Sequence, residues 1–112
     1  MGDGSLTLVR GTLDLLILKA LSTGEKHGYA VTEWIERVTS GTLLVEEGTL
    51  YPALHRLARR GLISAEWGLS DNNRRAKYYR LTPGGAKHLA REETTWRSYS
   101  AAVDRVLRER LG

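Results

Sequence analysis

Residues 46–61 constrain the fold of this chain more than any other stretch. A helix tolerates proline only in its first turn, so Pro52 predicts a helix that begins at about residues 47–49. At ~100° per residue, one side of this helix carries three apolar residues, Leu50, Leu54 and Leu57. Gly61 predicts its C-terminal end, after which the chain turns back into the core. The stretch therefore predicts an amphipathic helix with defined ends.

The opposite side of this helix is cationic. It presents Pro52, His55, Arg56 and Arg59, with Thr49 and Tyr51 on the flanks. The positive end of the helix dipole lies beside Thr49 and Tyr51, which favours a phosphate there. Two interpretations stay open from this stretch alone. It is either a recognition helix that enters the DNA major groove or a solvated cationic helix that covers a core.

The composition excludes several kinds of protein and site. With 112 residues, of which 41% are hydrophobic and 27% charged, the chain has the balance of one soluble globular domain. The absence of cysteine removes disulfides, thiolate metal sites and cysteine nucleophiles, and it fits a cytoplasmic protein. The longest apolar run, residues 13–21, is short and interrupted by charges, so we expect no membrane span.

Positive charge is concentrated in one part of the chain. Residues 55–80 hold seven Lys and Arg residues against two acids, a net charge of +5, whereas the whole chain carries +4. The remainder is therefore close to neutral. A basic patch on a neutral body is typical of a nucleic-acid-binding protein. A solvated face and a membrane-surface contact are the alternatives that charge alone leaves open.

Two helices are predicted before the central one, after a flexible N-terminus over residues 1–8. Residues 10–22, with Thr12 as N-cap, are apolar nearly all round, which indicates a helix buried on more than one side. Part of this helix is expected to face a partner subunit, through Leu13, Leu16 and Ile17. A second helix over residues 28–40 carries Tyr29 in its first turn, where the hydroxyl either meets a phosphate or packs internally.

Beyond the central helix the apolar period changes from 3.6 to about 2, which predicts strands. We expect strands over residues 63–69 and 74–82, joined by a polar turn over residues 70–73. The second strand carries cations near its start, Arg74, Arg75 and Lys77, followed by Tyr78. Two tryptophans are predicted to lie in the core, Trp34 and Trp67. Three helices followed by such a hairpin form the winged helix-turn-helix arrangement, with residues 9–82 as the DNA-binding domain.

A long helix is predicted over residues 83–112, because Thr82 is a good N-cap and Pro83 a good first residue. Its apolar residues form a heptad-like seam made of Leu89, Trp96, Tyr99, Val103, Val106 and Leu107. No other long helix is predicted, so the simplest partner is the same helix of a second copy. The fold class is therefore α+β and mostly helical, a winged helix-turn-helix with a C-terminal dimerisation helix.

The chain resembles the PadR-type transcriptional regulators, of the short class with one C-terminal dimerisation helix. The resemblance spans about residues 8–95 and rests on five segments, residues 13–18, 27–29, 47–57, 61–63 and 74–82. The run Gly-Thr-Leu-Tyr-Pro-Ala-Leu at 48–54 and the run Arg-Arg-Ala-Lys-Tyr-Tyr-Arg-Leu-Thr at 74–82 are its specific motifs. The chain departs from the family at residues 71–73, where Gly or Pro is common.

The resemblance implies a dimeric DNA-binding repressor in the bacterial cytoplasm, sometimes released by a small aromatic ligand. It implies that Thr49 and Tyr51 contact DNA and that His55 and Arg56 lie near bases or backbone. It also implies phosphate contacts from the second helix and the wing, by Tyr29, Arg75, Lys77 and Tyr78. An effector would stack on Trp96 in the dimer seam, although a purely structural Trp96 is the simpler interpretation.

Other classes of function find less support in the sequence. The three histidines are far apart and lack metal-ligand spacing, and no nucleophile motif is present, so we expect no enzyme, metal or cofactor. The serious alternative is a winged-helix protein–protein interaction module without a specific DNA target. A basic third helix together with a basic wing favours double-stranded DNA, because a protein-binding module does not need both.

Overall fold

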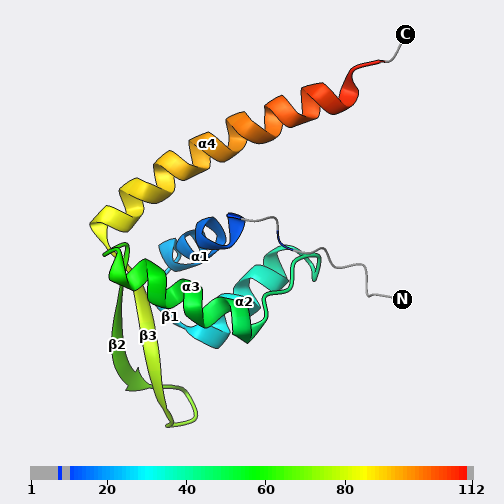
Figure 1. Cartoon of the computed structure of the whole chain (residues 1–112). Coiled ribbons are helices and arrows are strands. Elements are labelled where there is room, and N and C mark those ends of the chain that lie inside the picture. The colour runs from blue at the N-terminus through cyan, green and yellow to red at the C-terminus, as the bar shows by residue number, and fades with distance from the viewer. Residues whose placement is uncertain (1–7, 9–10, 111–112) are drawn as a thin grey trace.

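The computed structural model describes residue 8 and residues 11–110, and it confirms the winged-helix architecture (Figure 1). The prediction of a flexible N-terminus falls almost entirely outside the described residues, as do the last two residues of the predicted long helix. The elements in chain order are α1 (Thr12–Ser22), β1 (Lys26–His27), α2 (Gly28–Val38), α3 (Glu47–Arg59), β2 (Ile63–Leu69), β3 (Arg75–Leu81) and α4 (Pro83–Arg108).

The sheet has three antiparallel strands in the order β1-β3-β2. In the hairpin, Ile63 pairs with Leu81 at the base and Leu69 with Arg75 near the tip. Strand β1 pairs only Lys26 and His27 with β3, and two residues are too few to give a periodic signal in the sequence. The hairpin extends away from the helices, as Figure 1 shows, so only its base takes part in the core.

The core is formed where α1, α2 and α3 meet. The three leucines predicted to face inward from α3 are completely buried, Leu50, Leu54 and Leu57. They lie in one cluster with Ile17 and Leu18 of α1 and with Val31 and Ile35 of α2. Helix α3 begins at Glu47, so Pro52 lies beyond its first turn, where the missing N–H removes one bond to the carbonyl of Gly48.

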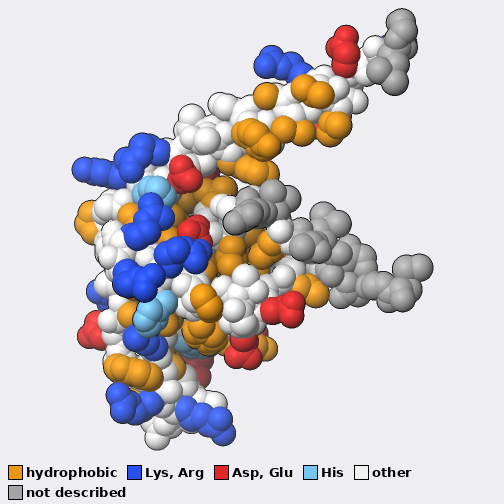
Figure 2. All heavy atoms as spheres, viewed as in Figure 1, with side chains coloured by type: hydrophobic (Ala, Val, Ile, Leu, Met, Phe, Trp, Pro, Cys, Tyr) orange, Lys and Arg blue, Asp and Glu red, His pale blue; other side chains and the backbone are white. Residues whose placement is uncertain are grey.

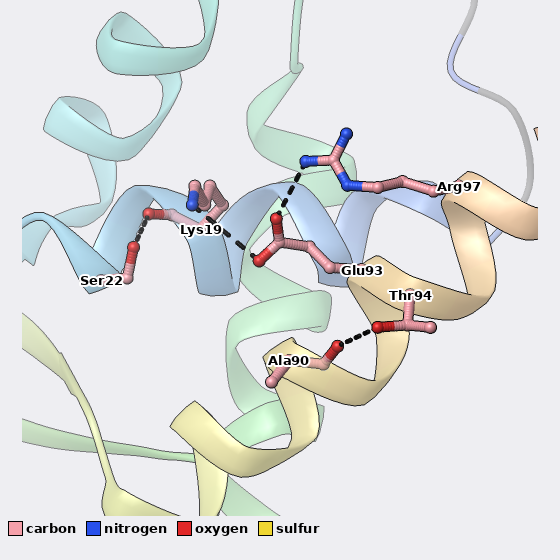
Figure 3. Close-up of polar contacts among 6 residues, drawn as sticks. All are labelled: Lys19, Ser22, Ala90, Glu93, Thr94 and Arg97. Carbon is pink, nitrogen blue, oxygen red and sulfur yellow. Dashed lines mark hydrogen bonds and ion pairs between the residues drawn. The ribbon is translucent and has the colours of Figure 1, made fainter.

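Helix α4 begins as predicted and then leaves the body of the molecule (Figure 1). The Thr82 hydroxyl accepts a hydrogen bond from the Gly85 N–H at 2.9 Å, which is the predicted N-cap. The first half of α4 packs on α1, where Glu93 lies 3.9 Å from Lys19 and 3.2 Å from Arg97 (Figure 3). The second half projects past the helical core and carries its apolar residues into solvent.

Several predictions about single residues are corrected by the structure. The N-cap of α1 is Gly11, at φ 89°, and Thr12 is already helical. Helix α2 ends at Val38 rather than residue 40. Trp67 is 58% exposed instead of buried, because it lies on the part of the hairpin that extends beyond the helices.

Three residues of the predicted dimer interface belong instead to the core of their own chain. Ile17 has no exposed surface, and Leu13 and Leu89 are 9% and 6% exposed. These side chains are buried because the start of α4 folds onto α1 within one chain. They leave little or no surface for a second copy, whereas Leu16 is only half-buried.

We predict that Gly85→Ala destabilises the fold and that Gly84→Ala does not. A Cβ at Gly85 would lie 1.9 Å from the Leu62 carbonyl oxygen, which is backbone and cannot rotate away. We expect a loss of about 3 kcal/mol or more, as for severe overpacking. At Gly84 the nearest atom is 3.8 Å away, and alanine should stabilise the helix by up to ~1 kcal/mol. Thermal unfolding of both variants checks this, and equal melting temperatures would contradict it.

Candidate nucleic-acid interface

Helix α3 presents the whole predicted outer face to solvent. Every residue predicted there is exposed, namely Thr49, Tyr51, Pro52, His55, Arg56 and Arg59. The burial of the leucine side fixes the rotation of α3 and so decides which side chains face outward. Within this face the residues divide between two flanks. Tyr51 and His55 lie towards the wing, and Thr49 and Arg56 lie towards α1.

An open groove of about 710 Å³ lies between the wing and the start of α2. Both Tyr29, which is 64% exposed, and Tyr51 line it, and so does the N-terminal turn of α2 at Gly28. The wing contributes its cations, Arg74, Arg75 and Lys77. Three elements far apart in the sequence therefore bring hydroxyl groups and positive charge to one groove.

The start of α2 is held by His27. Its Nδ1 accepts a hydrogen bond from the Ala30 N–H at 3.2 Å, so the imidazole caps the helix as a Ser or Asp side chain commonly does. The ring also packs edge-on against Tyr78, with centroids 5.6 Å apart. This arrangement ties the N-terminus of α2 to the wing. It was not predicted from the sequence, where residues 22–28 resemble an ordinary loop.

Gly28 allows Tyr51 to cross the start of α2. A Cβ at residue 28 would lie 2.7–2.9 Å from three atoms of the Tyr51 side chain. Only glycine leaves room for this contact, which holds a residue of α3 against α2. Tyr79 also lines the groove, where burial and then the neighbouring Tyr51 raise the pKa of its hydroxyl.

A smaller hollow of about 230 Å³ continues between α3 and the wing. Its lining includes His55 and Arg59 from α3 and Lys77 from β3. Lys77 borders both this hollow and the large groove, so the cations of the helix and of the wing form a continuous surface. In Figure 2 the Lys and Arg side chains run in a band over α3 and down to the tip of the wing.

Arg56 lies on the other flank of α3 and is paired with an acid. Its Nη2 donates to the Asp14 carboxylate of α1 at 2.6 Å. The pair borders a hollow of about 420 Å³ that also includes Thr49 and Pro52. Asp14 lies in the first turn of α1, and its contact with Arg56 was not predicted from the sequence. It cancels part of the Arg56 charge and holds its side chain in one position.

Tyr78 is separated from the groove. It lies on the opposite face of the hairpin from Arg75 and Lys77, and its hydroxyl donates to the Leu69 carbonyl at 3.1 Å. The alternation of strand side chains places Tyr78 there, one residue away from Lys77. The structure therefore does not bring this predicted phosphate ligand together with the others.

Two features that would indicate another kind of protein, a metal-holding cluster and a membrane span, are absent among residues 8 and 11–110. That part of the chain contains no group of three or more His, Cys, Asp or Glu residues placed to hold a metal ion. None of the described helices combines the length and the apolar character needed to cross a bilayer.

Comparisons with known proteins identify the family and the fold of the chain. The model of the transcriptional regulator PadR-like family matches residues 17–91. Transcriptional regulator Rv3488 of Mycobacterium tuberculosis is 34% identical over 103 residues, which cover 92% of this chain and 86% of that protein. A transcriptional regulator from Clostridium thermocellum has a similar structure, with 31% identity and a TM-score of 0.78 over 86% of this chain and 93% of that one. A PadR-like regulator from Bacillus cereus, 28% identical, has a TM-score of 0.76 over 90% and 96% of the two chains.

Fold and site together define a winged helix-turn-helix protein of the DNA-binding class, with a basic third helix beside a basic wing. Within this class the chain belongs to the PadR-like family of transcriptional regulators. Members of this family are regulators and not enzymes, as the sequence predicted.

We predict that Gly28→Ala destabilises the chain only while Tyr51 is present. The added methyl group must displace the Tyr51 ring, and we expect a cost of about 1 kcal/mol. In a Tyr51→Ala background the same change should be neutral or slightly stabilising, because alanine is the better helix former. Chemical denaturation of the four proteins measures the coupling. Equal effects of Gly28→Ala in both backgrounds would show that the close approach does not exist in solution.

Proposed function

We propose that the chain is a sequence-specific repressor of transcription that acts in the cytoplasm as a homodimer. Helix α3 enters the major groove of double-stranded DNA, and the wing lies along the adjacent phosphates. The observation that carries this proposal is the single groove in which Tyr29, Tyr51 and the wing cations meet. A phosphate backbone following this groove would find cations on the side of the wing and tyrosine hydroxyls on the side of α2 and α3.

The contacts divide into two kinds. Arg74, Arg75 and Lys77 would neutralise phosphates and release counterions, and Tyr29 and Tyr51 would fix the register of the protein on the duplex. Sequence would be read from the exposed face of α3, where His55, Arg56 and Arg59 are the candidates. A bidentate contact from arginine to guanine discriminates by ~1–3 kcal/mol. Arg56 would make such a contact with its orientation held by Asp14.

A protein-binding role for the winged helix is the alternative. Such a role requires one complementary surface, and it gives no reason for Arg59 of α3 and Lys77 of the wing to border the same hollow. The projecting half of α4 exposes an apolar stripe of its own, outside the groove that the wing cations line. The surface proposed for DNA and the surface proposed for a partner subunit are therefore on different elements.

The dimer proposal rests on that stripe. The projecting half of α4 exposes five large apolar residues, Trp96, Tyr99, Val103, Val106 and Leu107. A helix this long is hydrophobic on one side because something covers that side, and a second copy supplies an equally long stripe. Residues 83–112 would then form the dimerisation segment and residues 9–82 the DNA-binding domain.

Effector release remains a prediction with one supporting contact. Trp96 is 39% exposed, and its ring lies 6.4 Å from that of Tyr99. In the proposed dimer these rings would offer an aromatic surface on which a small aromatic molecule could stack.

We predict that binding to double-stranded DNA weakens steeply with salt and that Lys77→Gln flattens this dependence. The slope of log K against log salt should fall by about 0.9 for each phosphate that the protein no longer neutralises. Arg97→Gln is the matched control, because it removes the same charge from α4, where Arg97 pairs with Glu93. Fluorescence anisotropy with duplexes selected from a random library gives both affinity and slope. Affinity independent of salt would contradict the proposal and favour the protein-binding alternative.

We predict that the chain sediments as a dimer at micromolar concentration and that Val103→Glu makes it a monomer. Val103 is 38% exposed on the apolar stripe, and a carboxylate there would have to be buried without a partner. Ala101→Glu adds the same charge to the opposite side of α4 and should leave the dimer intact. Sedimentation of a monomeric parent chain, or equal effects of the two variants, would remove the dimer from the proposal.

A further inference from the structure

The packing of the core does not explain why Trp67 is exposed. It lies on β2 and is 58% exposed, although a tryptophan on a half-buried strand was expected to be part of the core. In the hairpin register it stands opposite Lys77, on the same face as the buried Ile63 and Tyr79. This face turns towards α3, and Trp67 lines the large groove with Tyr29 and Tyr51. An exposed indole therefore borders the groove in which we place DNA.

Two cations of the wing lie against the Trp67 ring. The guanidinium carbon of Arg75 is 4.7 Å from the ring centroid, and Nζ of Lys77 is 5.8 Å from it. Both distances are within the range in which the negative face of an aromatic ring attracts a cation, and tryptophan is the strongest of the aromatic residues in this respect. Among the described residues neither cation pairs with an acid, so the ring is the partner that orders both.

The kind of partner matters for what the cations can do. Arg56 is held by the Asp14 carboxylate, which fixes its side chain but cancels part of its charge. An aromatic ring fixes a side chain and leaves the full positive charge available to a third group. A flexible Lys or Arg loses rotamer freedom when it is immobilised on a ligand, and side chains ordered beforehand lose less.

We propose that Trp67 is a positioning residue that orders Arg75 and Lys77 towards the phosphates of bound DNA. The inference rests on the proposed function and adds a residue that acts through its neighbours. Because phosphates are alike in every sequence, the effect of Trp67 should be uniform over DNA sequences. It can therefore be measured on a labelled mixed-sequence duplex, without knowledge of the operator.

The test is a double-mutant cycle between the ring and the two cations. We expect Trp67→Leu to weaken binding to the mixed-sequence duplex about 5- to 20-fold, since two side chains lose their order. In an Arg75→Gln/Lys77→Gln background the same change should cost less than about twofold, because the ring then has nothing left to position. Trp67→Phe should lie between the parent chain and Trp67→Leu, because its ring attracts cations more weakly.

Leu69→Ala is the matched control. Leu69 is an exposed apolar residue on the same face of β2 as Trp67, and it has no ring for the cations to contact. We expect its replacement to change affinity less than about twofold, within the range of a minor surface change. Thermal unfolding of each variant shows that the wing is still folded. The salt slope of Trp67→Leu should approach that of the variant lacking both cations, whereas a purely structural role would leave the slope unchanged.

Three results would overturn the inference. An unchanged affinity of Trp67→Leu would show that the cations need no ordering. An equal loss in both backgrounds would show that the indole contacts DNA directly, and an equal loss in Leu69→Ala would show a general apolar contact of the wing. A parent chain that does not bind duplex DNA would overturn the proposed function itself, and that result differs from all three.

Discussion

The burial of one side of α3 is the constraint on which the rest of the interface depends. Leu50, Leu54 and Leu57 are each completely buried in a core shared with α1, α2 and the base of the wing, so α3 cannot rotate about its axis without exposing them. Every outward side chain is then fixed in direction before any ligand arrives. The recognition face is therefore a consequence of core packing, and its chemistry is free to vary while the leucines hold the helix in place.

The wing is ordered by other interactions than α3, because most of it lies outside the hydrophobic core. Only its base is buried, at Ile63 and Tyr79, and the outer half of the hairpin has no hydrophobic core to order it. Its order comes from strand pairing, from the hydroxyl of Tyr78 on the Leu69 carbonyl, and from the ring of Trp67 beneath two cations. The outer half of the wing is therefore exposed to a ligand while its side chains keep limited conformational freedom.

The sequence predicted well what depends on periodicity and local chemistry. The apolar spacing of α3 and the Thr82–Pro83 start of α4 can both be recognised from neighbouring residues, and the structure agrees with both predictions. Contacts between distant residues left no such signal. Nothing near Asp14 in the sequence indicates Arg56, and a two-residue strand such as β1 has no period to detect. Trp67 was misplaced because alternation shows which face a residue occupies and not how far along that face the core extends.

Helix α1 connects the DNA-binding face of α3 with α4, which carries the proposed dimer stripe. On one side its Asp14 holds Arg56 of the recognition helix, and on another its Lys19 lies 3.9 Å from Glu93 of α4 (Figure 3). Exposed pairs of this kind contribute little stability, ~0–1 kcal/mol each, so their effect is mainly on orientation. The buried face of α1, at Ile17 and Leu18, supplies the rigidity. In the proposed dimer, the pairing of two α4 helices would therefore set the separation of the two recognition helices through a single packed helix in each protomer.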